Sequence, residues 1–359
     1  MGFDLLEGEQ TIFSYSDALD PDHIPKLLPH RENQQLEIRN AIRPLLHGRT
    51  GDALLIRGGP GFGKTVVVKR MLMSLDEEEI GDKKISHVYI NCWRHNTTYK
   101  IVVELAHELG YKFTHNKNTS QIIDEIKRIV EHKDGIVLAF DEIDKIEDYD
   151  FLYFVLEEIK RKTLLLITND NDWGNKLDDR IKSRLTPIVL EFKPYEQNEI
   201  RDILKDRVKL AFYQNVWTDE AFNEIVNKAI NYSDIRAGIT LLKVTGEIAE
   251  QTGSRKVKLE HAKEAISNTS AFKIRVTSDL AEEEQHVLDI CKTNSGQTTG
   301  ELYKIYRQLG GQKSHKTFSR YLQDLETKKL IKLDMTGEGF AGKSSIITYI
   351  GDEKRLTEF

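Results

Sequence analysis

A glycine-rich stretch followed by a helix-forming run carries the clearest chemistry in this sequence. Residues 58–65 read GGPGFGKT, which gives Gly58, Gly63, Lys64 and Thr65 the spacing of a phosphate-binding loop. Glycines let backbone N–H groups approach phosphate oxygens, and the start of the next helix attracts negative charge. We expect the lysine to reach the β- and γ-phosphates of a nucleotide and the threonine hydroxyl to ligate Mg²⁺. The predicted cradle is Gly58, Gly59, Pro60, Gly61, Phe62, Gly63, Lys64, Thr65 and Val66.

Polar residues also follow two apolar runs further along the chain. Asp141 and Glu142 come directly after residues 135–140, and Asn169 follows residues 163–168. The carboxyl ends of parallel strands meet at one edge of a sheet, where ligands bind. We expect Asp141 to hold Mg²⁺ through water and Glu142 to orient and polarise an attacking water. The amide of Asn169 is suited to the γ-phosphate or that water, although an asparagine here is also a common turn residue.

Strands that alternate with helices must position these groups. The apolar runs predict strands at residues 53–56, 87–91, 135–140, 163–168 and 188–192. Helical periodicity between them predicts an α/β domain with its ligand at the carboxyl ends of the strands. A further helix precedes the first strand, and residues 1–28 are expected to form an irregular arm.

After Pro194 the pattern changes to helical periodicity alone, from position 196 to about 270. This predicts a small helical domain. Asp234 is placed to cap one of its helices, with Arg236 in the first turn. A cation there is disfavoured by the helix dipole, so we expect Arg236 to have an external anion as its partner rather than a local one.

From about position 277 three helices precede two strands separated by a glycine-rich turn, the order of a winged helix. The third helix is predicted at residues 314–328, with Phe318, Leu322 and Leu325 facing inward. Its outward residues and the hairpin tip are of the types that bind phosphates and bases. The predicted DNA-binding residues are Lys313, Ser314, His315, Lys316, Arg320 and Lys343.

Charge and composition limit the function classes. The formal net charge is −6, but residues 292–349 hold ten Lys or Arg against five Asp or Glu, so a DNA-binding surface would have to be local. The alternative is a winged helix used only for protein contacts. The length of 359 residues predicts two or three domains, and no run of about 18 apolar residues offers a membrane span.

The remaining bulk features indicate a cytoplasmic protein. The N-terminus lacks a basic region followed by an apolar one, which argues against secretion. Cys92 and Cys291 are far apart and outside any metal-spaced cluster, so we expect reduced thiols. The predicted location is the cytoplasm, in association with the nucleoid.

The motifs in their order resemble the AAA+ ATPases, and more narrowly the archaeal origin-recognition (Orc/Cdc-type) replication initiators. The matching stretches are LPHRE, GGPGFGKT, FDEIDKI, ITND, LDDRIKSRL, SDIR and the terminal winged helix. The resemblance implies an α/β ATPase domain with sheet order 5-1-4-3-2, an α-helical lid and a C-terminal winged-helix domain. We place these domains at 1–193, 194–274 and 275–359. ATP or ADP and Mg²⁺ are the implied cofactors.

The resemblance also implies roles for the nucleotide-site residues. His30 and Arg31 lie in the segment that lines the adenine site, residues 58–65 form Walker A, and Asp141 and Glu142 form Walker B. Phosphate-loop members of the family usually have a small threonine where this chain has Phe62.

Four further assignments rest on the likeness. Asn169 matches sensor one and Arg236 matches sensor two. Arg184 is similar to the arginine finger donated to a neighbouring subunit, and Arg180 is the competing candidate. Residues 171–182 fall where the family has a DNA-contacting insertion. Ser233 replaces a usual glycine before the sensor-two helix.

The expected function is therefore an ATP-dependent replication initiator, with slow ATP hydrolysis as a switch. Its implied partners are double-stranded origin DNA, paralogous initiator subunits and the replicative helicase. Two alternatives stay open. One is a nucleotide-gated DNA-binding module that retains ADP as a structural ligand, and the other is a signalling ATPase whose winged helix serves protein contacts.

Overall fold

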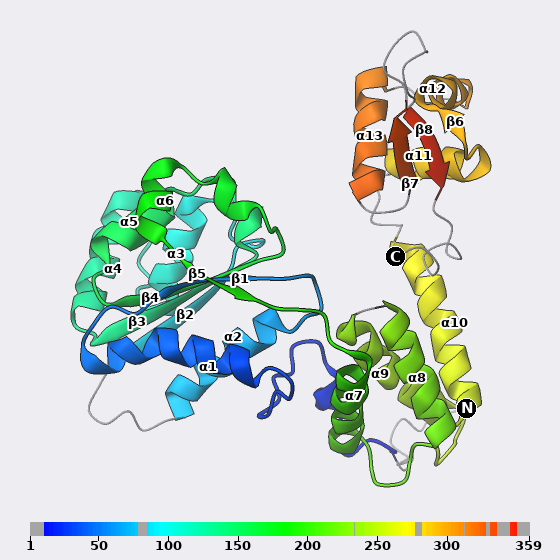
Figure 1. Ribbon diagram of the computed structural model, residues 1–359, viewed down its shortest axis with the longest axis horizontal. Helices are drawn as coiled ribbons and strands as arrows, with labels where there is room; N and C mark the ends of the chain where they lie inside the picture. Colours follow the sequence, from blue (N-terminus) through cyan, green and yellow to red (C-terminus); the bar gives the residue numbers. More distant parts are fainter. Residues whose placement is uncertain are drawn as a thin grey trace, which may run out of the picture. The chain divides into compact units, whose positions relative to one another are not determined.

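The computed structural model describes residues 11–77, 85–232, 234–276, 282–309, 311, 313–327, 331–335 and 345–349. The chain divides into two compact units, Met1–Ala262 and Lys263–Phe359. The division falls inside α10 (Leu259–Val276), a helix that passes from one unit into the other. Figure 1 labels the elements, and each unit is described separately.

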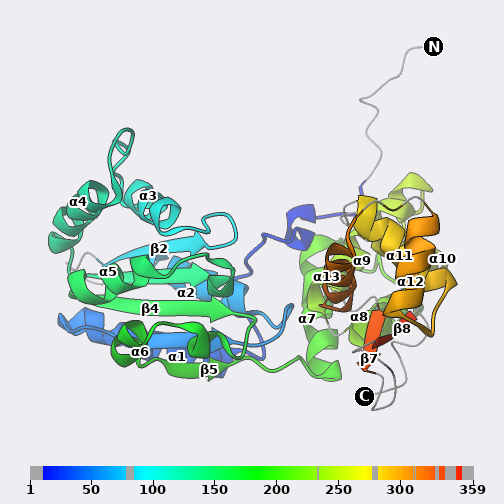
Figure 2. The ribbon, with the colours of Figure 1, turned by 90° about the horizontal axis from the view of Figure 1, so that it is seen from above.

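A five-stranded parallel sheet forms the centre of the first unit. Its strands are β1 (Ala53–Arg57), β2 (Ile85–Asn91), β3 (Gly135–Asp141), β4 (Lys162–Thr168) and β5 (Ile188–Glu191). Their order is β2-β3-β4-β1-β5, and Figure 2 shows β2 and β5 at opposite edges. Read from the β5 edge this is 5-1-4-3-2, so the expected sheet order is confirmed.

Helices cover both faces of the sheet (Figure 1). One face carries α1 (Glu32–Ile42) and α2 (Lys64–Glu77). The other carries α3 (Thr98–Glu108), α4 (Thr119–Glu131), α5 (Asp150–Glu158) and α6 (Asp179–Leu185). The described part of the unit also has the 3₁₀ helices η1 (Ser16–Leu19), η2 (Arg43–His47), η3 (Ile143–Lys145) and η4 (Trp173–Lys176). Strands buried on both faces read as continuous apolar runs, which explains the sequence of β3.

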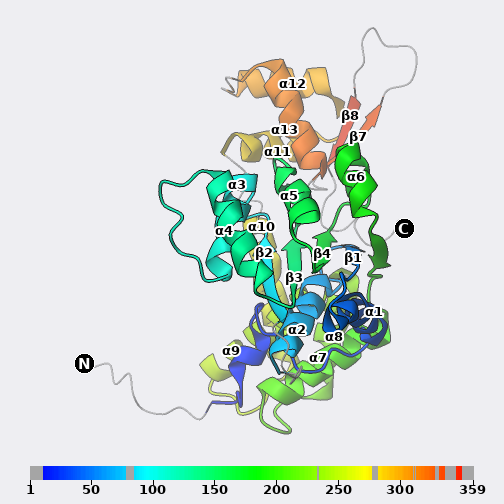
Figure 3. The same ribbon diagram turned by 90° about the vertical axis from the view of Figure 1, so that its left-hand side faces the viewer.

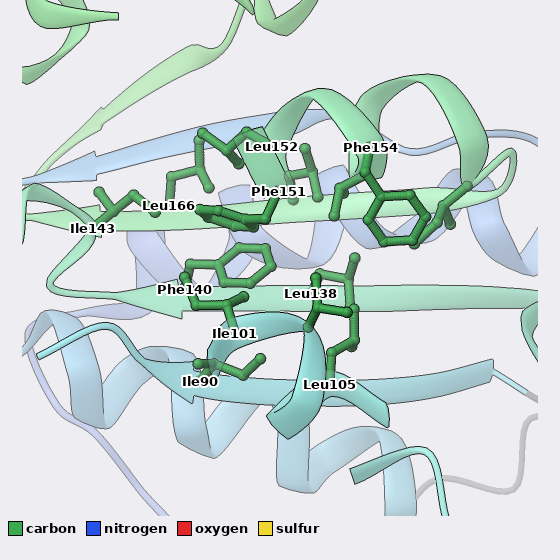
Figure 4. Close-up of a cluster of buried hydrophobic side chains, with 14 of the residues drawn as sticks. Ile90, Ile101, Leu105, Leu138, Phe140, Ile143, Phe151, Leu152, Phe154 and Leu166 are labelled. Atoms are coloured by element: carbon green, nitrogen blue, oxygen red, sulfur yellow. The ribbon is translucent and has the colours of Figure 1, made fainter. Parts of the chain in front are cut away.

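Successive residues of β3 point to opposite layers and fill two cores. Val137 packs toward α1 and α2, whereas Leu138 and Phe140 pack toward the larger helical layer. In Figure 4 the rings of Phe140 and Phe151 lie against each other, and their centroids are 4.9 Å apart in an edge-on arrangement. This packing holds the carboxyl end of β3 in place, next to Asp141.

A helical domain follows the sheet within the first unit. It contains α7 (Gln197–Ala211), α8 (Asp219–Tyr232) and α9 (Ile235–Gln251). Helix α7 begins three residues after Pro194, in agreement with the predicted change to helical structure. Asp234 caps α9 as predicted, because its side chain accepts a hydrogen bond from the backbone N–H of Arg236 at 2.9 Å.

The described part of the N-terminal arm, which starts at residue 11, packs on this helical domain. The ring of Phe13 lies 4.6 Å from that of Phe212, and Ile12 is buried. Arg207 donates to the carbonyl of Ala18 at 2.8 Å. The arm therefore adds to the core of the helical domain, although it precedes the sheet in the chain.

After α10, the described part of the second unit contains the helices α11 (Glu282–Thr293), α12 (Thr299–Gln308) and α13 (His315–Thr327) and a small antiparallel sheet, which Figure 3 shows. The strands of this sheet are β6 (Gln297–Thr298), β7 (Ile331–Met335) and β8 (Ser345–Tyr349). The strand order is β6-β8-β7. Three helices followed by a hairpin match the predicted order, and the two-residue strand β6 is an addition. Phe318, Leu322 and Leu325 are buried as predicted.

Across the described ranges no helix is long and apolar enough to cross a membrane. Cys92 and Cys291 are both buried free thiols, and burial raises the pKa of each.

Candidate nucleotide-binding site

The loop between β1 and α2 requires glycine at several positions. Gly61 and Gly63 have φ angles of 78° and 88°, in the region that favours glycine. A Cβ atom on Gly63 would lie 2.4 Å from the hydroxyl oxygen of Tyr195. One on Gly58 would lie 2.3 Å from the carbonyl oxygen of Phe192. The loop is therefore held open by the absence of side chains, as a phosphate cradle requires.

The other loop residues have more exposed positions. Pro60 is exposed, and Val66 is half-buried in the first turn of α2. The Phe62 ring lies against Gly59, because a Cβ on that glycine would meet the ring at 2.7 Å. The bulky residue that replaces the usual threonine thus packs on the loop itself.

Lys64 is buried at the start of α2, with 6% of its surface exposed. Its Nζ donates to the carbonyl oxygens of Gly58 at 2.7 Å and Gly59 at 2.8 Å, and to Asn169 Oδ1 at 2.7 Å. Burial lowers the pKa of the lysine to about 8, Asp141 opposes this shift, and Arg236 adds to it. The structure thus brings together Lys64 and Asn169 at neighbouring strand ends.

Asp141 is nearly fully buried and accepts three hydrogen bonds. Its Oδ2 accepts from the hydroxyls of Thr65 at 2.7 Å and Tyr89 at 2.6 Å. Its Oδ1 accepts from the backbone N–H of Glu142 at 2.9 Å. Tyr89 was not predicted from the sequence, and the signal that could have found it is its position two residues before the end of the strand paired with β3.

Glu142 follows Asp141 in a left-handed backbone conformation with φ 53°. Burial and the charge of Asp141 raise the pKa of its carboxyl, and a hydrogen bond from Asn91 opposes this rise. Asn91 lies opposite Asp141 in the β2–β3 register, so it is a second functional candidate that the sequence reading missed.

Asp144 lies in η3, just after β3, and supports the end of the neighbouring strand β4. It accepts hydrogen bonds from Thr168 Oγ1 at 2.9 Å and pairs with Lys145 Nζ at 2.8 Å. Burial alone would raise the pKa of Asp144, but these two hydrogen bonds outweigh it and the net shift is downward. The carboxylate therefore stays charged and fixes the chain beside Asn169.

The residues present fit a nucleotide with a hard divalent cation. No group of three or more His, Cys, Asp or Glu side chains in the described parts of the chain could hold a metal ion by itself. Mg²⁺ usually takes only one or two protein oxygens and completes its shell with phosphate and water. The Thr65 hydroxyl and the Asp141 carboxylate provide such a pair, next to the glycine cradle.

Arg236 lies at the start of α9, beside the phosphate loop. A Cβ on Gly61 would lie 2.4 Å from Oδ1 of Asp234, the residue that caps α9. The expectation that Arg236 lacks a local partner is wrong. Its Nε and Nη2 donate to the two carboxylate oxygens of Asp234 at 3.2 and 3.1 Å, because the side chain folds back onto the cap. The carboxylate offsets the unfavourable dipole.

The side chains of His30 and Arg31 both contact other parts of the protein. Arg31 is 4% exposed and donates to three backbone carbonyls. The His30 ring lies 3.7 Å from a carboxylate oxygen of Glu199 and 3.3 Å from one of Asp202, both on α7. The assignment of both residues to an adenine site remains a prediction.

The two arginine-finger candidates lie on α6. Arg184 pairs with Glu157 of α5 and donates to the carbonyl of Arg180 at 3.1 Å. Arg180 pairs with Asp178 at 3.1 Å. Among the described residues neither forms a hydrogen bond or ion pair with the phosphate loop, and their action on another subunit remains a prediction. In the preceding segment Trp173 is fully buried, so part of the predicted DNA-contacting insertion serves the core.

The predicted DNA-reading residues at the start of α13 are accessible. Lys313, Ser314, His315, Lys316 and Arg320 are all exposed. In the portion of the second unit that the structure covers, the side chains of Lys313, Lys316 and Arg320 form no ion pair with an acidic residue. Lys343 lies outside the described residues.

Comparisons with known protein families agree with this geometry. The family profile described as "AAA domain" matches residues 47–171, and the one described as "Cdc6 AAA+ ATPase-type lid domain" matches residues 201–267. These two matches cover the phosphate loop, the sheet strands through β4 and most of the helical domain.

Similar proteins cover nearly the whole chain. ORC1-type DNA replication protein 1 of Sulfurisphaera tokodaii is 32% identical over 96% of this chain and 92% of its own length. ORC1-type DNA replication protein 2 of Methanothermobacter thermautotrophicus is 30% identical over 96% and 93%.

Two solved structures share the fold. The Aeropyrum pernix ORC1 protein in complex with DNA matches with a TM-score of 0.82 and 24% identity, over 98% of this chain and 96% of its own. The Aeropyrum pernix ORC2 protein in its ADPNP–ADP complexes has a TM-score of 0.66 and 19% identity, over 94% of each chain.

Proposed function

The chain belongs to the family of ORC1-type DNA replication proteins, and from this membership we propose that it is an ATP-dependent initiator that binds duplex DNA at a replication origin. ATP occupies the phosphate loop, and α13 of the second unit enters the major groove. Paralogous initiator subunits and the replicative helicase are its partners by family likeness.

One observation carries the proposal. A chain that is similar to replication proteins over nearly its full length also forms two hydrogen-bonded pairs at one sheet edge, Lys64 with Asn169 and Thr65 with Asp141. Lys64 is buried against the glycine loop and its pKa is lowered, a combination that is typical of functional sites.

The residues act on the nucleotide as follows. Loop N–H groups and the Lys64 ammonium hold phosphate oxygens. Thr65 and Asp141 hold Mg²⁺, whose charge offsets that of the β- and γ-phosphates. Glu142 orients the attacking water and accepts its proton, and Asn169 contacts the γ-phosphate or that water.

Hydrolysis is slow and acts as a switch in this proposal. The hydrogen bond from Asn91 to Glu142 supports it, because a carboxylate held by an amide is less available to a water. Among the described residues Arg184 pairs with Glu157 and not with the phosphate loop, which supports it as well, because the site would then need an arginine from a neighbouring subunit.

Arg236 links nucleotide state to the helical domain. Among the described residues its guanidinium donates to both carboxylate oxygens of its own cap, Asp234. A γ-phosphate carries more negative charge and attracts the same guanidinium, which draws the start of α9 toward the nucleotide. This closure sets the state in which DNA is bound.

The proposal is tested by measuring ATP hydrolysis and duplex binding with the full chain. We expect a slow hydrolysis that Glu142→Gln lowers by about 10²-fold or more, and duplex affinity that falls steeply with salt. Absence of any nucleotide binding would overturn the proposal. A protein that releases ADP on denaturation but never hydrolyses ATP would favour the ADP-retaining module instead. Salt-insensitive background binding without a footprint would favour the signalling ATPase.

A further inference from the structure

The helical domain is joined to the sheet by two stretches of chain. The arm packs on the helical domain, and the chain then runs through residues 21–31 to α1. The second connection is residues 192–196, between β5 and α7. Any movement of the helical domain relative to the phosphate loop must bend both connections.

A single side chain ties these connections together and to the phosphate loop. Arg31, at the end of the first connection, donates from Nη2 to the carbonyl of Lys193 in the second, at 2.9 Å. Its Nε donates to the carbonyl of Phe62 in the phosphate loop, at 3.1 Å. Its Nη1 donates to the carbonyl of His30, at 2.9 Å. The fork of the guanidinium thus spans three separate backbone segments.

An aromatic ring completes the junction. The guanidinium carbon of Arg31 lies 3.7 Å from the centroid of the Tyr195 ring. The hydroxyl of Tyr195 stands over Gly63, where a Cβ would be only 2.4 Å away. Tyr195 lies two residues before α7. A residue that directly precedes the helical domain therefore contacts the phosphate loop.

Arg31 is a buried cation whose partners among the described residues are backbone carbonyls and an aromatic ring instead of a carboxylate. Only 4% of the residue is exposed, and no carboxylate is recorded as its partner in the described ranges. Burying a charge costs free energy unless it is well hydrogen-bonded. Here backbone carbonyls and the ring face provide the compensation, and a planar fork does this in a way that a lysine ammonium cannot.

We propose that Arg31 is a positioning residue that couples occupancy of the phosphate loop to the angle of the helical domain. When phosphates draw the loop N–H groups toward them, the carbonyl of Phe62 and the backbone at Gly63 shift. Arg31 transmits this shift to Lys193 and Tyr195, which lead into α7. This inference rests on the proposed nucleotide binding, and it gives Arg31 a role distinct from lining an adenine site.

The test compares Arg31→Lys with wild type and with Arg39→Lys, an exposed arginine of α1 as the matched control. ADP affinity is measured by calorimetry, and amide hydrogen exchange of residues 192–200 and 234–240 is measured with and without saturating ADP. Thermal unfolding without ligand shows whether the variant is folded. Tyr195→Leu provides a second variant that removes the ring face but leaves the guanidinium.

In wild type and Arg39→Lys, ADP should slow exchange in both segments. In Arg31→Lys, ADP affinity should fall by about tenfold, as expected when hydrogen bonds to a charged group are lost. At saturating ADP the exchange in both segments should remain as in the ligand-free protein. Tyr195→Leu should show the same loss of protection.

Two results would overturn the inference. One is unchanged affinity and protection in Arg31→Lys, and the other is weakened affinity with full protection once ADP is saturating, which would make Arg31 a local support of the loop only. If wild type itself fails to bind ADP, the proposed function fails first, and the two failures are thereby distinguished.

Discussion

Lys64 Nζ lies 2.7 Å from Oδ1 of Asn169, across the carboxyl ends of the neighbouring strands β1 and β4. The lysine is thus fully engaged by an amide and two loop carbonyls before any phosphate is present. Bound phosphates would place charged oxygens beside Lys64 Nζ, in place of these neutral amide and carbonyl oxygens. This exchange gives the site a measurable dependence on pH.

We predict that ADP binding takes up a proton near pH 8 and weakens at higher pH. Burial lowers the pKa of Lys64 to about 8, so part of the population is neutral there. Phosphate charge favours the ammonium form and raises that pKa. Calorimetry at pH 8 in two buffers with different ionisation enthalpies measures the proton uptake, which Lys64→Met should abolish. Equal binding enthalpies in the two buffers for wild type would contradict the prediction.

The lowered pKa of Lys64 has the opposite effect on folding: it makes the ligand-free protein more stable as the pH rises. The native pKa of Lys64 lies below its ordinary value, so the ligand-free fold is penalised below pH 8, and this penalty disappears as the pH rises toward 10.5. Ligand-free wild type should therefore gain stability relative to Lys64→Met between these pH values in denaturant titrations.

Glu142→Gln should lower ATP hydrolysis by about 10²-fold or more and leave ATP binding within a few-fold of wild type. The amide keeps the size of the side chain but accepts no proton. Glu108→Gln, an exposed change at the end of α3, is the control. A wild-type rate no faster than that of Glu142→Gln would remove the claim of catalysis at this site.

Tyr89→Phe should weaken Mg²⁺-dependent nucleotide binding by about tenfold, because hydrogen-bond partners of metal ligands have effects of this size. The change removes the hydroxyl that donates to Asp141 at 2.6 Å. Binding of ADP in the presence of a chelator should be unaffected. Tyr99→Phe, at a partly exposed position of α3, controls for loss of a hydroxyl elsewhere. An equal effect with and without Mg²⁺ would show that Tyr89 only supports the fold.

Much of this site follows from the sequence. The phosphate loop, the buried strands and the polar residues at their ends have strong local patterns, because a strand buried on both faces must be continuously apolar. The topology then requires the ends of β1, β3 and β4 to meet. Positions of Lys64, Asp141 and Asn169 were predictable for this reason.

The parts that were missed depend on contacts between distant segments. Tyr89 and Asn91 belong to a strand whose pairing with β3 is needed before they can be placed beside Asp141 and Glu142. The arm has too few apolar residues for a period, and its described part is placed by contacts with the helical domain and with α1 and α2. The local pairing of Arg236 with its own cap was missed because dipole reasoning ignores a neighbouring carboxylate.

Lys316→Ala and Arg320→Ala should each weaken duplex binding and reduce the slope of log K against log salt by about 1. Both side chains are exposed on α13 without a recorded acidic partner in the described second unit. Lys209→Ala, an exposed lysine on α7, should leave the slope unchanged. Binding isotherms at several salt concentrations provide the check. An unchanged slope in both α13 variants would move the DNA contact away from this helix.

Nuclease protection on a duplex selected by the full-length chain from a random library tests the central claim most directly. The account predicts that the wild-type footprint differs in extent between ADP and a non-hydrolysable ATP analogue. It predicts that Lys64→Ala gives one footprint regardless of nucleotide. Identical footprints for wild type under both nucleotides, matching those of Lys64→Ala, would contradict the coupling of the phosphate loop to DNA binding.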